Sequence, residues 1–361
     1  MIPASSRRDL MLAAAATVPE ARLAQLAGEK GILFGTMAAV RLLDESPVLL
    51  PEAIARDARI VVPGLELKWS SQLRPAADRF DFEPAERMLG FAEGLGLQSK
   101  GHALVWHVGL PAWVPASPGR AEAQAMLRAH ITAVCRRFAG RLHSWDVVNE
   151  AIQPHEGHPQ GLRNTPFLRG LGPDYIEEAF HLAAAADPQA LRVLNDFNLE
   201  MNNPYQDARR RALLALLERL IRRGVPVQAL GIQGHIFAGD PRSPFAPRVF
   251  ERFLRDVASL GLRIQITELD VPDEHLPGDV ARRDRMAAEA IGDYLAVALA
   301  ERAVDFLTLW GLSDRGNYLD AQPATRRADG RPSRPHLYDA DFVRKPAWHA
   351  VARALQAAPR R

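Results

Sequence analysis

The sequence predicts an α/β protein that folds as a single (β/α)8 TIM barrel. Short apolar, β-rich runs alternate with longer amphipathic helix patterns, and eight such runs occur. No linker, repeat or low-complexity tract divides the 361-residue chain. Alternation of this kind calls for a parallel sheet covered by helices, and eight strand–helix units point to a closed barrel.

The expected strands and helices follow from these runs in order. The strands are predicted at residues 32–37, 58–64, 97–106, 143–150, 190–197, 227–236, 262–270 and 304–311. Apolar positions at helical spacing predict helices at 84–95, 121–138, 174–186, 205–222, 247–259 and 279–301, with a shorter one near 51–57 and a last one at 346–357. The Pro- and Gly-rich stretch 314–336 follows the eighth strand and predicts a long loop at the barrel mouth.

The N-terminus has the pattern of an export signal. Arg7-Arg8 precede a short apolar run from Leu10 to Val18, and "SRRDLM" resembles a twin-arginine signal. We therefore expect an export signal at residues 1–25 and a barrel domain at 26–361, with the protein periplasmic or secreted. The alternative is a first helix of the fold in a cytoplasmic protein.

Charge and cysteine content exclude several partners. The formal net charge is +2, from 45 basic and 43 acidic residues, so no strong field for nucleic acid or an anionic membrane is expected. No apolar run is long enough to span a bilayer, and we expect a monomer. Cys135 is the only cysteine, which excludes an intrachain disulfide, and its amphipathic helix pattern predicts a buried inert thiol.

Polar residues gather at the C-terminal ends of seven predicted strands. In a barrel these ends face one mouth, so their side chains are expected to form one site. They are Lys68-Trp69, His102 with Trp106-His107, Asn149-Glu150, Asn195-Asp196, Gln233 with His235, Glu268 with Asp270, and Trp310 with Asp314.

Two of these residues suggest a reaction. Glu150 and Glu268 end the fourth and seventh strands, and a pair of carboxylates flanking a sugar bond is the apparatus of glycoside hydrolysis. Trp106 and Trp310 suit the apolar faces of sugar rings. The alternative is that the strand-end Glu residues pair with Arg or Lys and only hold the barrel together.

Metal and nucleotide chemistry find less support. His102 and His107 are expected on opposite faces of a strand, and His155 and His158 lie in a loop without helical zinc spacing. No glycine-rich phosphate-binding stretch follows a strand. We expect neither a metal nor a cofactor.

Six motifs in order resemble the family 10 glycoside hydrolases, chiefly endo-β-1,4-xylanases with retaining chemistry. The motifs are "GHALVWH", "WDVVNEAI", "LNDFN", "GIQGHI", "ITELDV" and "LTLWGLSD", and the likeness runs from about Leu33 to "KPAWHAV" at 345–351. The resemblance implies a β-linked glycan substrate and, for retention, carboxyl groups roughly 5–5.5 Å apart.

The same resemblance implies a role for each matching residue. Glu150 corresponds to the general acid/base, and Asn149 to the group that contacts the 2-hydroxyl of the attacked sugar. Glu268 corresponds to the nucleophile, with His235 and Asp270 as a relay that hydrogen-bonds it. The groups implied to hold sugar on the nonreducing side of the cleaved bond are Lys68, His102, Trp106, Gln233 and Trp310, and Tyr318 keeps an aromatic surface there.

Three departures from the family pattern affect the expected substrate. Gly64-Leu65 replace a Glu-Asn pair that normally holds the next sugar, Gly109 replaces a Gln, and Asn317-Tyr318 replace a Ser-Trp. We expect cleavage of β-1,4-xylosidic bonds in xylan or xylo-oligosaccharides. The alternatives are the same mechanism on another β-linked or decorated glycan, and a non-catalytic glycan-binding barrel.

The "WDVVNE" stretch also carries a geometric prediction. Adjacent residues on a regular strand point to opposite faces, so Asn149 and Glu150 cannot both reach one sugar from it. The strand must therefore end or bulge at this place.

Overall fold

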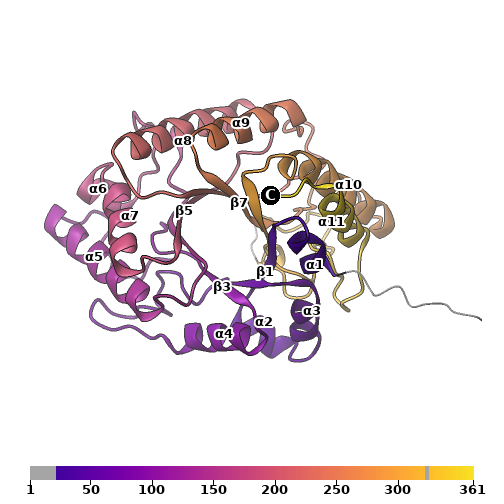
Figure 1. The fold of residues 1–361 in the computed structure, drawn as a ribbon, viewed down its shortest axis with the longest axis horizontal. Helices are drawn as coiled ribbons and strands as arrows, with labels where there is room; N and C mark the ends of the chain where they lie inside the picture. The colour runs from indigo at the N-terminus through magenta and orange to yellow at the C-terminus, as the bar shows by residue number, and fades with distance from the viewer. Residues whose placement is uncertain (1–21, 322–324) are drawn as a thin grey trace, which may run out of the picture.

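A computed structural model describes residues 22–321 and 325–361 and contains the predicted closed barrel of eight parallel strands (Figure 1). Each strand pairs with the next along the chain, and β8 pairs with β1. The strands are β1 (Leu33–Ala38), β2 (Ile60–Pro63), β3 (Gln98–Gly101), β4 (Ser144–Asn149), β5 (Leu191–Asp196), β6 (Ala229–Ile232), β7 (Arg263–Leu269) and β8 (Val304–Leu309).

Helices surround the barrel, as Figure 1 shows. All eight predicted helices are present, and the largest shift is at the end of α10, predicted at 301 and found at Ala298. They are α3 (Leu49–Asp57), α4 (Glu83–Gly94), α5 (Arg120–Arg137), α7 (Tyr175–Ala186), α8 (Pro204–Arg222), α9 (Pro247–Ser259), α10 (Val280–Ala298) and α11 (Pro346–Ala357).

Three helices of six residues each were not predicted: α1 (Leu23–Gly28), α2 (Val40–Glu45) and α6 (Pro166–Leu171). Six residues make fewer than two turns, too few to establish a period of 3.6. Only α6 carries a readable start signal, since Thr165 precedes Pro166 and its side chain accepts a hydrogen bond from the Leu168 amide at 3.0 Å. Two short 3₁₀ helices, η1 (Pro154–Glu156) and η2 (Leu319–Ala321), lie in loops.

Helix α1 extends the packed domain toward the N-terminus. Leu23 and Ala27 are fully buried, and the Leu23 amide donates to Asp57 Oδ1 at 3.0 Å. The helix spans the predicted boundary between residues 25 and 26, and it precedes Leu33, where the sequence pattern becomes clear. The expected export signal falls mainly on residues 1–21, which lie outside the described residues, so export stays a prediction. Within the described part of the chain, no helix combines the length and hydropathy that crossing a bilayer requires.

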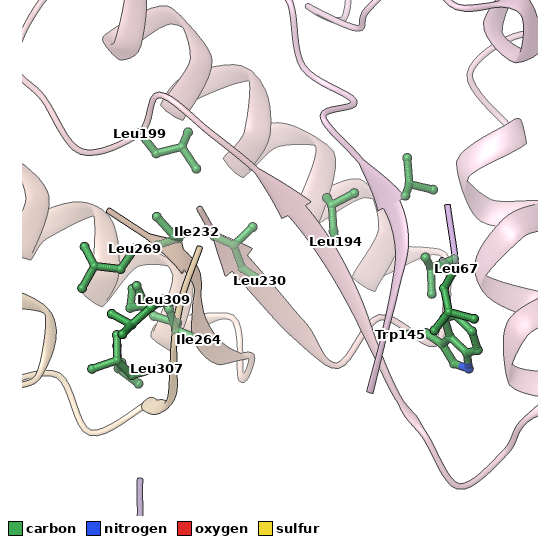
Figure 2. Close-up of a cluster of buried hydrophobic side chains, with 14 of the residues drawn as sticks. Leu67, Trp145, Leu194, Leu199, Leu230, Ile232, Ile264, Leu269, Leu307 and Leu309 are labelled. Carbon is green, nitrogen blue, oxygen red and sulfur yellow. The ribbon is translucent and has the colours of Figure 1, made fainter. Parts of the chain in front are cut away.

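The hydrophobic core lies between the strands and the helix layer. Strand side chains such as Leu194, Leu230, Ile232 and Ile264 are fully buried (Figure 2). Leu230 and Ile232 are two residues apart on β6, as expected for side chains on the same face of a strand. Cys135 on α5 belongs to this core, and burial raises the pKa of its thiol well above the ordinary value. The prediction that this thiol is buried is confirmed.

The inside of the barrel contains a buried charged pair. Lys100 Nζ donates to Asp146 Oδ1 at 2.7 Å and to Gln265 Oε1 at 2.9 Å, and all three side chains are buried. Such a pair is stable only when both charges have partners, as they do here. Because Asp146 Oδ2 also lies 2.8 Å from His102 Nδ1, this pair supports the mouth of the barrel.

Two strands shift their register just before the mouth. On β4, Asp146 and Val148 pair with the consecutive residues Val193 and Leu194, so β4 contains one extra residue. On β7, a second shift lies between Ile266 and Leu269. One extra residue reverses the alternation of side chains beyond it.

The predicted long loop after β8 is anchored by charged pairs. Asp314 Oδ2 lies 3.0 Å from Lys345 Nζ, and Arg334 binds Asp284 with its Nη2 at 2.7 Å. Burial raises the pKa of Asp314 to about 6, against the opposing effect of Lys345. The expectation that Asp314 belongs to the mouth site is wrong, because its carboxylate is used to hold this loop to the helix layer.

Candidate active site

A cavity of about 260 Å³ opens at the C-terminal ends of the strands. Ten of the eleven site residues predicted from the sequence line it: Lys68, His102, Trp106, Asn149, Glu150, Gln233, His235, Glu268, Trp310 and Tyr318. The eleventh, Asp270, is buried and bound to His235. The predicted site is therefore assembled in one place.

Glu150 reaches the cavity because strand β4 ends at Asn149. Glu150 has a left-handed backbone conformation, with φ of 59°. Its amide donates to the Asn195 carbonyl at 2.8 Å, and its own carbonyl accepts from Arg163 Nε at 2.8 Å. Non-glycine residues adopt this conformation only when the surroundings hold them there. Together with the extra residue on β4, this confirms that the strand bulges and ends here.

Amide side chains connect the two carboxylates. Asn195 Nδ2 donates to Glu268 Oε1 at 2.7 Å and to Asn149 Oδ1 at 2.9 Å. Gln233 Nε2 donates to Glu150 Oε1 at 3.2 Å and to Asn149 Oδ1 at 3.4 Å. Glu150 and Glu268 thus stand at the two ends of one hydrogen-bonded chain.

Asn195 is a site residue that the sequence analysis did not assign. It appeared among the polar strand ends but received no role. The side-chain oxygen Oδ1 of Asn195 accepts a hydrogen bond from Thr267 Oγ1 at 2.7 Å. This bond fixes the side-chain amide so that its NH₂ group faces Glu268 and Asn149. Thr267 and Glu268 are neighbours on β7, and both reach Asn195 because of the register shift there.

His235 bridges Glu268 and Asp270. Its Nδ1 lies 2.7 Å from Asp270 Oδ1, and its Nε2 lies 3.6 Å from Glu268 Oε2. Although burial opposes the charged imidazolium, Asp270 and then Glu268 raise the pKa of His235 well above its ordinary value. The two carboxyl groups therefore favour the charged form of the ring.

Glu268 is buried but ionised. Burial raises the pKa of its carboxyl, while His102, His235 and Lys68 together outweigh burial and hold that pKa below the ordinary value. A carboxylate that keeps its charge in a buried place suits nucleophilic attack.

Replacing His235 by Asn should move the acid limb of the pH profile to higher pH. Without the imidazolium the pKa of Glu268 rises, so the carboxylate is lost at a higher pH as the solution is acidified. The profile of kcat/KM for an aryl β-xyloside measures this limb. His181→Asn on the exposed face of α7 is the matched control and should leave the limb in place. An unchanged acid limb in the His235 variant would contradict the assignment.

Lys68 lies between the two tryptophans of the cavity. Its Nζ is 4.6 Å from the centroid of the Trp106 ring and 5.5 Å from that of Trp310. Burial lowers the pKa of Lys68, and Glu268 and Glu150 oppose that shift. Trp106 Nε1 is buried without a hydrogen-bond partner among the described residues, so it can donate to a bound hydroxyl.

The third strand is shorter than predicted, which changes the placement of two histidines. Strand β3 ends at Gly101, and His102 begins an irregular segment with a cis peptide bond to Ala103. The premise that His102 and His107 alternate along one strand is therefore wrong. His102 turns its Nδ1 to Asp146, and its ring packs against Trp310 in a T-shaped arrangement. His107 Nδ1 lies 3.9 Å from Glu150 Oε2, and burial together with Arg163 lowers its pKa.

Only some of the residues that depart from the family pattern lie at the cavity. Gly64 and Leu65 line the cavity, and so does Tyr318, whose hydroxyl lies 3.4 Å from His235 Nδ1. Gly109 does not line it. Within the described residues no group of three His, Cys, Asp or Glu side chains could hold a metal ion. The site offers two carboxylates, amides and aromatic rings, a set suited to acid–base chemistry on a hydroxylated substrate.

Comparison with known proteins supports this chemistry. The family model described as Glycosyl hydrolase family 10 matches residues 22–354. Endo-1,4-beta-xylanase B of Thermotoga neapolitana is 32% identical over 307 residues, covering 84% of this chain and 83% of the relative. The crystal structure of native xylanase 10B from Thermotoga maritima, 30% identical, superposes with a TM-score of 0.82 over 93% of this chain and 98% of that one. The xylanase 10B of Thermotoga petrophila RKU-1, solved in complex with xylobiose, has the same TM-score, identity and coverage.

Proposed function

Since this chain belongs to glycosyl hydrolase family 10 and is a xylanase-class glycoside hydrolase, we propose that it cleaves β-1,4-xylosidic bonds by a retaining double displacement. Glu268 is the nucleophile and Glu150 the general acid/base. The observation that carries this assignment is that both carboxylates line one cavity, and that His235 links Glu268, 3.6 Å from its Nε2, to the buried carboxylate of Asp270, 2.7 Å from its Nδ1.

In the first step the Glu268 carboxylate attacks the anomeric carbon of the sugar. The bond to the leaving oxygen breaks, and Glu150 donates its proton to that oxygen. The products are a shortened chain with a free hydroxyl and a sugar esterified to Glu268. Asn149 donates to Glu150 and is linked to Glu268 through Asn195, which places it to bind the 2-hydroxyl, where hydrogen bonds strengthen in the transition state.

In the second step a water molecule attacks the same carbon. Glu150, now ionised, accepts a proton from the water, and the ester bond to Glu268 breaks. The sugar leaves with its original β configuration, and both carboxyl groups return to their starting states. His235 and Asp270 favour the ionised form of Glu268 before the first step and after the second, and they hold its side chain in a fixed orientation.

The sugar ring itself is held by the groups around Lys68. Trp106 and Trp310 offer aromatic faces, and Lys68, His102 and Gln233 offer polar atoms toward the cavity. His102 is oriented by Asp146, so Nδ1 donates to the carboxylate and Nε2 remains for a hydroxyl.

The anomeric form of the first product tests the mechanism. Incubating the purified protein with xylohexaose should yield shorter oligosaccharides whose new reducing ends appear first as the β-anomer in proton NMR spectra, because two inversions restore the configuration. A Glu268→Gln sample serves as the blank. The α-anomer appearing first would overturn the assignment of Glu268 as a nucleophile.

The proposal also concerns which glycan is the natural substrate. Both carboxylates are present and connected, which favours a catalyst over a barrel that only binds glycans. Gly64 and Leu65 line the cavity with small or apolar surface, which favours a decorated chain over plain xylan. That the enzyme is exported and monomeric stays a prediction.

A further inference from the structure

The cavity has two chemically different ends. The carboxylates and amides line one of them. Five small or apolar residues from β1, the start of α2 with the residue before it, and the segment after β2 line the other, which we call the apolar end: Met37, Ala39, Leu42, Gly64 and Leu65.

Met37 fills the space that a side chain at residue 64 would use. A Cβ atom on Gly64 would lie 2.7 Å from Met37 Sδ and 2.8 Å from its Cγ. No polar side chain can therefore enter the cavity from position 64 while Met37 stays in place. The thioether is held there because β1 and β2 are neighbours, with Met37 paired to Val62 and the Gly64 amide donating to the Ala38 carbonyl at 2.8 Å.

Leu65 completes this end with an exposed apolar side chain. It is 45% exposed and follows directly after Gly64. A leucine that stands at the rim of a sugar site leaves apolar surface in water unless something covers it.

The positive charge nearest the apolar end, that of Arg41, is already paired within the protein. Arg41 lines the cavity, but its Nη1 binds Glu45 Oε1 at 2.6 Å and its Nη2 donates to the Gly316 carbonyl at 3.3 Å. Lys68 also lines the cavity, but its Nζ lies over the Trp106 and Trp310 rings and its charge interacts with Glu268 and Glu150. A substrate carboxylate at the apolar end would therefore find no unpaired cation among the residues that form it. A further hydroxyl-rich sugar would give up water for a methionine and leucines, which is unfavourable.

A small uncharged substituent fits these properties. We propose that the apolar end binds an O-acetyl group on the xylan chain, on the sugar that lies beyond the attacked one on the nonreducing side, and that Met37 and Leu65 determine this specificity. Glu150, at the leaving group, directly follows β4, whereas the apolar end is formed by β1 and the segments that follow β1 and β2, so the two ends receive opposite sides of the cleaved bond. This inference rests on the proposed function of the site.

Matched substrates test the proposal. Acetylated xylo-oligosaccharides are compared with the same preparation after mild alkaline deacetylation, and with oligosaccharides that carry uronic acid or arabinose branches. The wild-type kcat/KM should be about tenfold higher for the acetylated preparation, since one added apolar group in a pocket contributes discrimination of that order. Leu65→Asn and Met37→Gln should each bring the ratio of acetylated to deacetylated kcat/KM toward one.

Leu95→Asn is the control, because Leu95 is also an exposed leucine but follows α4, outside the residues that line the cavity. It should leave the ratio unchanged. Equal or faster cleavage of the deacetylated preparation, or a preference for uronic acid or arabinose branches, would overturn the inference while the proposed function stands. Lack of turnover on every preparation and on an aryl β-xyloside would overturn the proposed function and this inference with it.

Discussion

Replacing Glu268 by Gln should abolish turnover while the fold remains. The amide keeps the shape of the side chain and an oxygen that can accept from Asn195, but it cannot attack the anomeric carbon. We expect kcat for an aryl β-xyloside to fall by at least about 10⁴-fold, which corresponds to about 5 kcal/mol of lost transition-state stabilisation.

The control for this variant is Glu251→Gln, an isosteric change on the exposed face of α9. Circular dichroism and Tm of both variants establish that the barrel is intact. An active Glu268→Gln protein, within about tenfold of wild type, would remove Glu268 from the mechanism.

Replacing Glu150 by Ala should separate the two steps of the reaction. Xylo-oligosaccharides need a protonated leaving group, so their kcat/KM should fall by about 10²–10⁴-fold. A dinitrophenyl β-xyloside needs little protonation of its leaving group and should still form the covalent intermediate quickly. The second step then becomes limiting, because no base activates the water.

Added azide tests whether the lost group is the general base of the second step. As a nucleophile that needs no general base, it should restore turnover of the dinitrophenyl substrate and give the β-xylosyl azide, which NMR identifies. Glu122→Ala on the exposed face of α5 is the control and should show neither the loss nor the azide effect. The α-azide, or a uniform loss on both substrates without rescue, would show that Glu150 is not the acid/base group.

The barrel and most of its site could be predicted because both follow from local order along the chain. Alternating apolar runs and helix patterns have a period that the neighbouring residues define, and eight of them suffice for a closed sheet. Glu150 directly follows β4 and Glu268 lies one residue before the end of β7, and parallel strands bring their carboxyl ends to one mouth. Ten predicted residues line one cavity for this reason.

The predictions that were wrong concern contacts between distant parts of the chain, which a short stretch of sequence does not encode. The third strand stops at Gly101 although the run to Trp106 is largely apolar, and His102, just beyond its end, turns its Nδ1 to Asp146 on the neighbouring strand. Asp314 was placed with the mouth groups, but Lys345, far along the chain, binds its carboxylate.

The sequence by itself determined the fold class, the two carboxylates and the residue types around them. Only the tertiary structure decided how they face one another. The register shifts on β4 and β7 depend on pairing with β5 and β8, and they turn Asn149 and Glu268 toward Asn195. Packing between β1 and β2 likewise places Met37 over Gly64. Such contacts join residues distant in the chain, so they depend on complementary packing in three dimensions and not on local periodicity.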